Sequence, residues 1–389
     1  MNKKRLGKSK NIYWAIITVL FSIAIILNVL AWMSRSFCDA YIENVFPVWG
    51  RIYGIFTNLT NRSVGEIMLY LAAVLILFML IAIIWLFALK VSGKGGRFAS
   101  ALKGYLRIIL MITAIEAVVM TLNCFILYHC STFNQKYMPE IESDRKYTIQ
   151  ELAEVRDVVV NRANALAEHM QRDEEGNIIY DGDMAAAAIR EMKKLGEKYP
   201  QLDGYYGHPK AFATSEFFSQ QYMMGYYFPF SMEANYNDVM YIANIPATMC
   251  HELAHTKGFI YEDEANFIGF LACLHSEDEF IEYCGYLSVI SYLSNDLYES
   301  LGKDKVAYSK YAKASDLVVH DRVFLTRSAW EQVEKKAVLD TETVKEASNK
   351  FIDTNLKVNG IDQGAAMYSE VVDYLIDYYM SGLDEYFCR

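Results

Sequence analysis

Three long apolar segments dominate the first third of the chain. Residues 13–33 and 67–89 contain no charged side chain, and residues 108–128 contain a single acid, Glu116. About 20 apolar residues in a helix cross the roughly 30 Å hydrocarbon layer of a bilayer. The pattern therefore predicts three transmembrane helices. The first is not typical of a cleaved signal peptide, because its apolar run is long and no small-residue cleavage site follows it.

The pattern becomes that of a water-soluble domain after residue 129, with no further run that could span a membrane. Thr148 and Glu151 have the spacing of a capping box, which marks the start of a helix. Aromatic and β-branched residues with turn formers replace the helical period further on. The predicted elements are helices over residues 148–170 and 183–199, short strands between residues 205 and 245, and helices from residue 246 almost to the end.

These segments predict a membrane-anchored, mainly α-helical protein. A basic tail of residues 1–12 precedes a three-helix transmembrane region of residues 13–129. Residues 130–389 then form an α+β soluble domain with a small sheet and a mostly helical C-terminal half. The chain is too apolar for a disordered or fibrous protein, with 53% hydrophobic residues.

Charge is divided unequally along the chain. Residues 1–129 contain 13 basic and 4 acidic side chains, whereas the remainder contains 24 basic and 43 acidic ones. The acidic soluble part argues against nucleic acid as a partner. Lysine and arginine precede the first span and gather between spans two and three, at residues 90–107. The positive-inside rule therefore predicts a protein of the cell membrane with a cytoplasmic N-terminus and an extracytoplasmic soluble domain.

Two features of the spans allow more than one interpretation. Glu116, near the middle of span three, is either a functional group or a protonated or hydrogen-bonded side chain facing the other helices. Cys38 and Cys130 follow spans one and three on the same side, so a disulfide between them is possible but not established. The seven cysteines contain no CxxC pair and indicate no zinc framework.

The main candidate for chemistry is His251-Glu252-Leu253-Ala254-His255, an H-E-x-x-H motif. On a helix, His251 and His255 lie one turn apart on one face, so both imidazoles can hold one Zn²⁺ ion. Glu252 then lies beside a water on that ion and can accept its proton as a general base. The alternative is a surface helix whose histidines hold no metal.

A catalytic zinc site needs a third protein ligand. Gly258 is placed to end the helix, and an acidic cluster that includes Glu262 and Glu264 follows. Tyr261 stands where the pattern H-E-x-x-H-x-x-G-x-x-H has its last histidine, and tyrosine is a poor zinc ligand. An acid is therefore the better candidate.

Glu262-Asp263-Glu264-Ala265-Asn266 resembles the E-x-x-A-[DN] segment of gluzincin-type peptidases, including the membrane-bound prenyl-protein and heat-shock peptidases. The resemblance implies that Glu262 is the third ligand and that Asn266 supports the site. Glu264 is the competing ligand.

A wider resemblance covers nearly the whole chain. The three spans, the sequence of residues 225–235, the HELAH motif and the segment entering span two, residues 62–66, are similar to a bacterial membrane family catalogued as a domain of unknown function with zincin-like features. This resemblance implies a zincin-like peptidase fold without an established substrate. Residues 228–235 would form the strand that lines the cleft, beginning at Phe228. Glu233 within it either contacts substrate or is an exposed strand acid.

Together these features predict a membrane-anchored zinc-dependent metallopeptidase that hydrolyses peptide bonds on the extracytoplasmic side. Its partners would be a peptide or protein substrate and the lipid bilayer. The alternative is a non-hydrolytic zinc-binding receptor or scaffold with the same fold. The sequence does not predict the oligomeric state.

Overall fold

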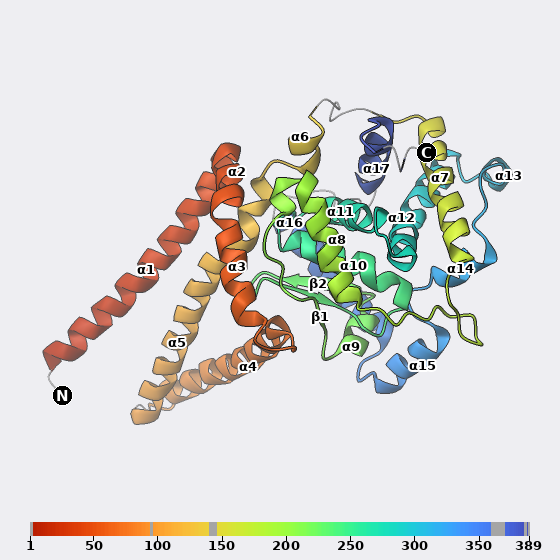
Figure 1. The fold of residues 1–389 in the computed structure, drawn as a ribbon. Helices are drawn as coiled ribbons and strands as arrows, with labels where there is room; N and C mark the ends of the chain where they lie inside the picture. The colour runs from red at the N-terminus through yellow and green to blue at the C-terminus, as the bar shows by residue number, and fades with distance from the viewer. Residues whose placement is uncertain (1–2, 94–95, 140–145, 359–369, 385–386, 388–389) are drawn as a thin grey trace.

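Three long helices extend from one side of the structure, a computed structural model that describes residues 3–93, 96–139, 146–358, 370–384 and 387 (Figure 1). These are α1 (Lys3–Met33), α4 (Val64–Val91) and α5 (Arg97–Met120). The segments long and apolar enough to cross a membrane are Asn11–Met33, Val64–Val91 and Phe98–His129. The prediction of three helices long and apolar enough to span a membrane is confirmed.

The third span changes its helix type before it ends. A π-helical turn, η1 (Thr121–Phe125), follows α5, and a 3-10 turn, η2 (Leu127–His129), closes the span. Thr121 accepts a hydrogen bond from Asn28 of α1 at 2.8 Å, which pairs spans one and three inside the membrane region. Glu116 of α5 is half-buried, and its Oε2 has no hydrogen-bond partner among the described residues.

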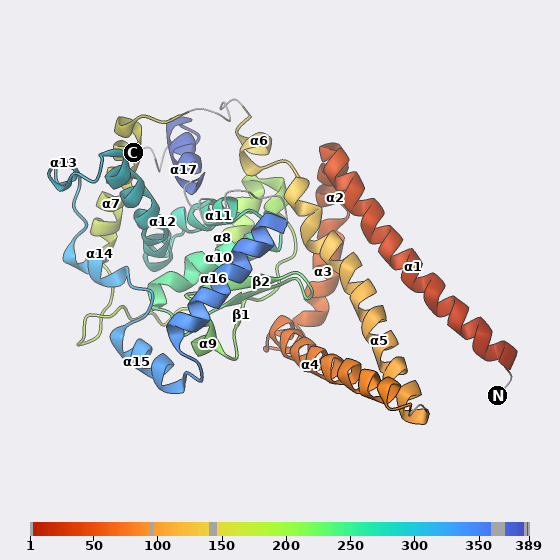
Figure 2. The ribbon, with the colours of Figure 1, turned by 180° about the vertical axis from the view of Figure 1, so that it is seen from behind.

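Two short helices join span one to span two outside the spanning segments. Ser34 caps the N-terminus of α2 (Arg35–Asn44), because its hydroxyl accepts from the Phe37 N–H. α3 (Phe46–Thr57) follows α2 directly. α4 and α5 meet at one end and diverge toward the main body, and both views show α3 in the opening between them (Figure 1 and Figure 2). Cys38 and Cys130 are both free thiols, so the possible disulfide is not formed.

The remaining helices form the main body. Their bounds are α6 (Phe133–Tyr137), α7 (Ile149–Ala167), α8 (Met184–Lys198), α9 (Ser215–Gln220), α10 (Ile245–His255), α11 (Glu262–Leu274), α12 (Glu279–Ser300), α13 (Lys305–Tyr308), α14 (Asp316–Asp321), α15 (Arg327–Lys336), α16 (Thr341–Val358) and α17 (Glu370–Met380).

The predicted helix starts are confirmed at α7 and α8. The Thr148 hydroxyl accepts from the Glu151 N–H, and the Glu151 carboxylate accepts from the Thr148 N–H, so the capping box is complete. Asp183 caps α8. α9 was not predicted, because its six residues lie in an aromatic-rich stretch and are too few to show a helical period.

A three-stranded sheet lies beside the central helices, in the order β1-β3-β2. β2 (Gly225–Phe228) pairs antiparallel with β3 (Glu233–Tyr236), and β1 (Lys210–Ala211) pairs parallel with β3. The expectation of one strand over residues 228–235 is therefore wrong. Phe228 ends β2 and its carbonyl accepts from the Met232 N–H at 2.7 Å, which closes a turn before β3 begins. β2 is an edge strand.

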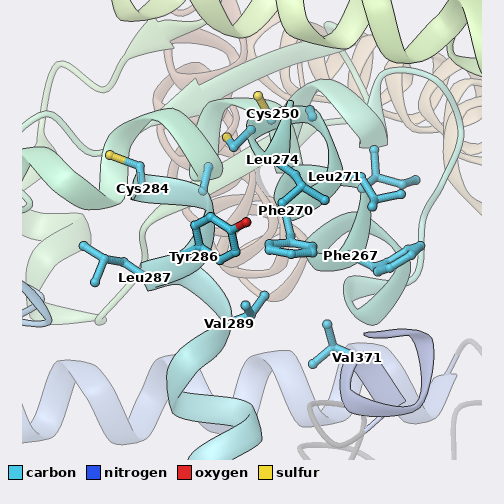
Figure 3. Close-up of a cluster of buried hydrophobic side chains, with 14 of the residues drawn as sticks. Cys250, Phe267, Phe270, Leu271, Leu274, Cys284, Tyr286, Leu287, Val289 and Val371 are labelled. Atoms are coloured by element: carbon cyan, nitrogen blue, oxygen red, sulfur yellow. The ribbon is translucent and has the colours of Figure 1, made fainter. Parts of the chain in front are cut away.

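The core forms where α10, α11, α12 and α17 meet (Figure 3). Phe270 of α11, Tyr286 of α12 and Val371 of α17 are fully buried there, with Cys250 of α10. α11 is apolar on almost every side after its first turn, because it lies at the centre of the body. Burial of this kind contributes about 25 cal/mol per Å² of apolar surface, so these contacts hold α10 and α11 in place.

Buried charges join the start of span two to the sheet. Lys210 Nζ donates to the carbonyls of Thr57 and Arg62 and pairs with Glu233, and the other Glu233 oxygen accepts from the Gly65 N–H at 2.8 Å. Glu233 is 5% exposed. It is neither an exposed strand acid nor free to contact a substrate, because its carboxylate is already bonded on both sides.

Asp321 at the end of α14 is the centre of a second buried polar network. It is fully buried and accepts both terminal nitrogens of Arg172, at 2.9 and 2.7 Å, with the hydroxyls of Tyr241 and Tyr283 at 3.0 and 2.7 Å. Burial alone would raise the pKa of Asp321, but the hydrogen bonds from Arg172 and Tyr283 lower it below its ordinary value. Tyr241 immediately precedes the 3-10 turn η4 (Ile242–Asn244) that leads into α10, so the network fixes the start of that helix.

Asp321→Asn should lower the free energy of unfolding by about 3–5 kcal/mol, because it leaves Arg172 without its charged partner. Since the folded-state pKa of Asp321 is lowered, its contribution is present above the ordinary carboxyl pKa of about 4 and is lost as the pH falls below it. Thermal unfolding in detergent, followed by circular dichroism, should show a large difference between wild type and variant at neutral pH and a smaller one in acid.

Glu331→Gln is the matched control, because its ion pair with Arg327 is largely exposed. Exposed pairs contribute at most about 1 kcal/mol. Equal melting temperatures for wild type and Asp321→Asn at neutral pH would contradict the assigned role of the network.

Candidate metal centre

The two histidines of the H-E-x-x-H motif lie on the inner face of α10, one turn apart. Their Nε2 atoms approach each other to 3.0 Å. Pro246 fits the first turn of this helix, where its missing N–H costs nothing. Asn244 stands at the N-cap, but its side chain donates to the carbonyls of Val323 and Phe324 instead of capping the helix. Gly258 then ends the segment with a φ of +89°.

Each imidazole is oriented by a hydrogen bond to its other ring nitrogen. His255 Nδ1 lies 2.7 Å from the carbonyl oxygen of Phe259, and His251 Nδ1 lies 2.9 Å from Oδ1 of Asn266. Both partners are acceptors, so both Nδ1 atoms carry the proton. The Nε2 atoms of both rings face the same point. Burial lowers the pKa of His251, but its hydrogen bond to Glu262 and the nearby carboxylates raise it above its ordinary value.

The start of α11 brings the acidic residues beside this pair. Glu262 places its two carboxylate oxygens 3.2 Å from His251 Nε2 and 3.8 Å from His255 Nε2. Glu264 points elsewhere: its buried carboxylate accepts from the Phe133 N–H. Tyr261 also turns away, and its hydroxyl donates to the Tyr128 carbonyl at 2.6 Å. Of the two candidate acids, the structure places Glu262 at the histidines.

A close approach between two helices makes this arrangement possible. A Cβ added to Gly269 of α11 would lie 2.9 Å from the Ala247 carbonyl of α10 and 3.3 Å from the His251 nitrogen. Only a residue without a side chain allows α11 to lie this near to α10. Glu262 and Asn266 lie about two turns and one turn before Gly269, so the same contact brings both to the histidines.

Glu252 lies under the edge strand of the sheet. A Cβ added to Gly225 of β2 would lie 2.4 Å from Glu252 Oε1, so the glycine leaves the space that the carboxyl group occupies. Glu252 is 4% exposed, and its Oε1 lies 3.9 Å from His251 Nε2. Its Oε2 is buried without a hydrogen-bond partner among the described residues. A polar atom in that position is costly unless a ligand or water satisfies it.

The electrostatics of the cluster follow from burial and from its own charges. Burial, with the nearby Glu262 carboxylate, raises the pKa of Glu252 to about 8. Burial, with the neighbouring His251, lowers the pKa of His255 to about 4. Burial would raise the pKa of Glu262, but the two imidazoles lower it to about 2. At neutral pH, Glu262 is thus ionised, His255 is neutral and Glu252 is protonated in most molecules.

The donor set fits a zinc ion. Two imidazole nitrogens and one carboxylate converge from two helices, which is the ligand set of a catalytic zinc site with an open position. A cation between them would contact both imidazole nitrogens and the carboxylate at once. The hydrogen bonds to Asn266 and Phe259 are of the kind that orients metal-binding histidines.

Some parts of the site were missed by the sequence-based interpretation. Gly225 and Gly269 allow the two close approaches, and the Phe259 carbonyl orients His255. A glycine inside a predicted strand is a known sign of close backbone approach, so Gly225 carried a usable signal. Phe228 lies at the end of β2, and its ring lies against Gly65 at the start of span two.

The comparison with known families confirms one part of the wider resemblance, the membership of a family of unknown function. A family described as "Protein of unknown function (DUF3810)" matches residues 41–376, and the chain belongs to it. No curated protein and no solved structure matches the chain. The matched region begins within α2 and includes spans two and three, so the family unit joins the membrane helices to the main body.

The ligand assignment predicts an order of zinc affinities among three variants. Asn266→Ala removes the acceptor for His251 Nδ1–H and should weaken binding about 10–100-fold. Glu262→Gln removes a charged ligand and should weaken it further. Glu264→Gln should leave zinc affinity unchanged, although losing its bond from Phe133 N–H should lower stability. Competition with a chromophoric chelator, using the purified full chain, measures all three.

The proper reference in this experiment is the folded fraction of each variant, measured by circular dichroism in the same samples. A larger loss of zinc affinity in folded Glu264→Gln than in Glu262→Gln would transfer the ligand role to Glu264. Negligible loss in both would dismiss an acidic ligand.

Proposed function

We propose that this protein is a membrane-anchored, zinc-dependent metallopeptidase. One observation carries the proposal: the Nε2 atoms of His251 and His255 and the carboxylate of Glu262 converge beside Glu252, whose Oε1 lies 3.9 Å from His251 Nε2. The other oxygen of Glu252 is buried without a hydrogen-bond partner among the described residues. A structural ion pair does not require an unpartnered acid at its edge. A hydrolytic site does, because a base must face the reacting water.

Zinc would be held by His251, His255 and Glu262, and when bound it polarises a carbonyl group and lowers the pKa of water. Glu252 would take a proton from the attacking water and later give it to the leaving amine. Its raised pKa suits both tasks, because a group that titrates near the working pH can accept and return a proton. Asn266 would hold His251 in the orientation that keeps Nε2 available.

The sheet offers a place for an extended peptide. β2 is an edge strand, and Gly225 lies against Glu252. A peptide that adds to a free strand edge is held by main-chain hydrogen bonds and therefore needs no single side-chain sequence. A substrate paired to β2 would have its backbone next to Glu252, which supports a peptide bond as the target.

We place the main body on the extracytoplasmic side of the cell membrane, on the charge distribution around the spans. A cysteine at Glu174, in the exposed loop between α7 and α8, should react with a membrane-impermeant maleimide in intact cells. The matched control is Ser92→Cys, at the end of α4, which should react only after permeabilisation. Labelling is compared with that of the unsubstituted chain, and the reverse result would place the reaction in the cytoplasm.

Glu252→Gln should separate metal binding from turnover. The amide has the same shape and fits below Gly225, so zinc content and fold should be retained. Loss of the base should lower the cleavage rate roughly 10²–10⁴-fold. His251→Ala should lose both zinc and activity. Turnover of a peptide library by the purified full chain, read by mass spectrometry with zinc measured in parallel, tests both variants.

The same experiment distinguishes the peptidase from a zinc-binding receptor or scaffold. A wild-type protein that holds zinc but cleaves nothing beyond what Glu252→Gln cleaves would be the receptor. Full activity of Glu252→Gln would show that another group is the base.

A further inference from the structure

The candidate metal centre lies directly against the end of the third span. Tyr261 immediately precedes Glu262, and its hydroxyl donates to the carbonyl of Tyr128 in η2, the last turn of that span. The two tyrosine rings meet edge to face at 5.6 Å. A single hydrogen bond thus links the backbone at the membrane end of span three to the residue beside Glu262.

The edge strand is fixed to the same span. Asn123 of η1 is 1% exposed, and its amide donates to the carbonyl of Pro229, the residue after β2, at 2.8 Å. Tyr227 of β2 donates in return to the Asn123 carbonyl at 3.4 Å. Both the strand above Glu252 and the start of α11 are therefore held by residues 121–129.

α3 lies between the end of α10 and the membrane region. Its inner face packs on the end of the motif helix, because a Cβ added to Gly50 would lie 3.8 Å from the Thr256 carbonyl. Its outer face exposes a continuous apolar set that no described residue covers, consisting of Val48, Ile52, Ile55 and Phe56. Water-soluble surfaces rarely expose such a patch.

The bilayer is the occupant that this face fits. α3 is joined through α2 to the end of span one and leads directly to span two, and it lies in the opening between α4 and α5 (Figure 1 and Figure 2). Its apolar face is therefore continuous with the surfaces of the spans. Arg51 lies on the same side and is exposed. An arginine beside apolar residues suits the headgroup level, where its charge reaches water or phosphate.

These contacts put the centre at the membrane surface rather than at the far end of the body. We infer that its substrates are polypeptides anchored in the same bilayer and cleaved within a few residues of the membrane surface. The inference rests on the proposed peptidase function. A tethered chain is held at high effective concentration near β2, whereas a free chain must reach the same strand from solution.

The test uses the full chain in proteoliposomes and one reporter sequence that the purified protein cleaves in the peptide library. The reporter is attached to a single transmembrane helix through linkers of about 3, 10 and 30 residues, whose reach grows roughly as the square root of length. The same sequence is also presented on a palmitoyl anchor and as a soluble peptide. Glu252→Gln proteoliposomes are the control for cleavage by any other protein.

The short-linker reporter should be cleaved fastest, and the soluble peptide about 10-fold or more slowly at equal total concentration. Rapid cleavage of the palmitoyl form would extend the substrate class to lipid anchors, and its slow cleavage would restrict the class to spanning helices. Equal rates for the soluble and all anchored forms would overturn the inference while leaving the peptidase intact. Cleavage of no peptide in the library would overturn both.

An independent measurement does not require activity. An environment-sensitive fluorescent amino acid at position 55 should be quenched by nitroxide lipids. The same probe at position 338 should not, because Val338 is exposed just after α15, which lies on the side of the main body away from the spans (Figure 1). Emission typical of an aqueous environment at position 55 would show that α3 does not lie in the bilayer, and this result would overturn the inference.

Discussion

The close packing of α10 on α11 is the contact from which the rest of the site follows. Gly269 lets the two helix backbones approach within the space that any side chain would fill. That approach sets the separation of the imidazoles from Glu262 and Asn266 at hydrogen-bonding distance. The same helices carry the largest buried cluster of the main body. The apolar core therefore supplies the rigidity that a preorganised polar site needs, since side chains on packed helices are held more precisely than those on loops.

The membrane helices and the main body depend on each other in the same way. Glu66 at the start of span two is 2% exposed and accepts hydrogen bonds from the backbone of Ala213 and Thr214 after β1. Lys210 and Glu233 bond to the loop before it, and Asn123 holds the residue after β2. Buried polar groups linked in this way are costly to separate, because each would lose its partner. The spans are thus part of the structure that shapes the sheet, rather than a removable anchor.

Local patterns in the sequence predicted the local structure well. The apolar runs marked all three spans, the Thr148 capping box marked α7, and Gly258 marked the end of α10. Each of these signals acts within a few residues, where steric and hydrogen-bonding rules are strong. The histidine spacing likewise predicted that both imidazoles share one face of α10, which the structure shows.

The errors occurred where contacts between distant segments decide the structure. Residues 228–235 contain two phenylalanines that suit a strand, but the turn after Phe228 is set by pairing between β2 and β3. The sequence around Glu233 does not show that this acid is buried, because Lys210 and Gly65 come close to it only in the folded structure. α2 and α3 were included in a membrane region by their position between spans, although one face of α3 packs against the main body. No local rule contains these partners.

The acidic first turn of α11 illustrates why the site is better explained by chemistry than by stability. Glu262, Asp263 and Glu264 all lie where the positive end of the helix favours negative charge. Glu264 uses that position structurally, through its bond from the Phe133 N–H. Glu262 instead faces the Nε2 atoms of both imidazoles, and Glu252 is buried nearby with one oxygen that has no hydrogen-bond partner among the described residues. A buried carboxyl oxygen without a donor opposes folding, because the loss of its hydration is not compensated. Such a conflict is typical of residues retained for a ligand or a reaction.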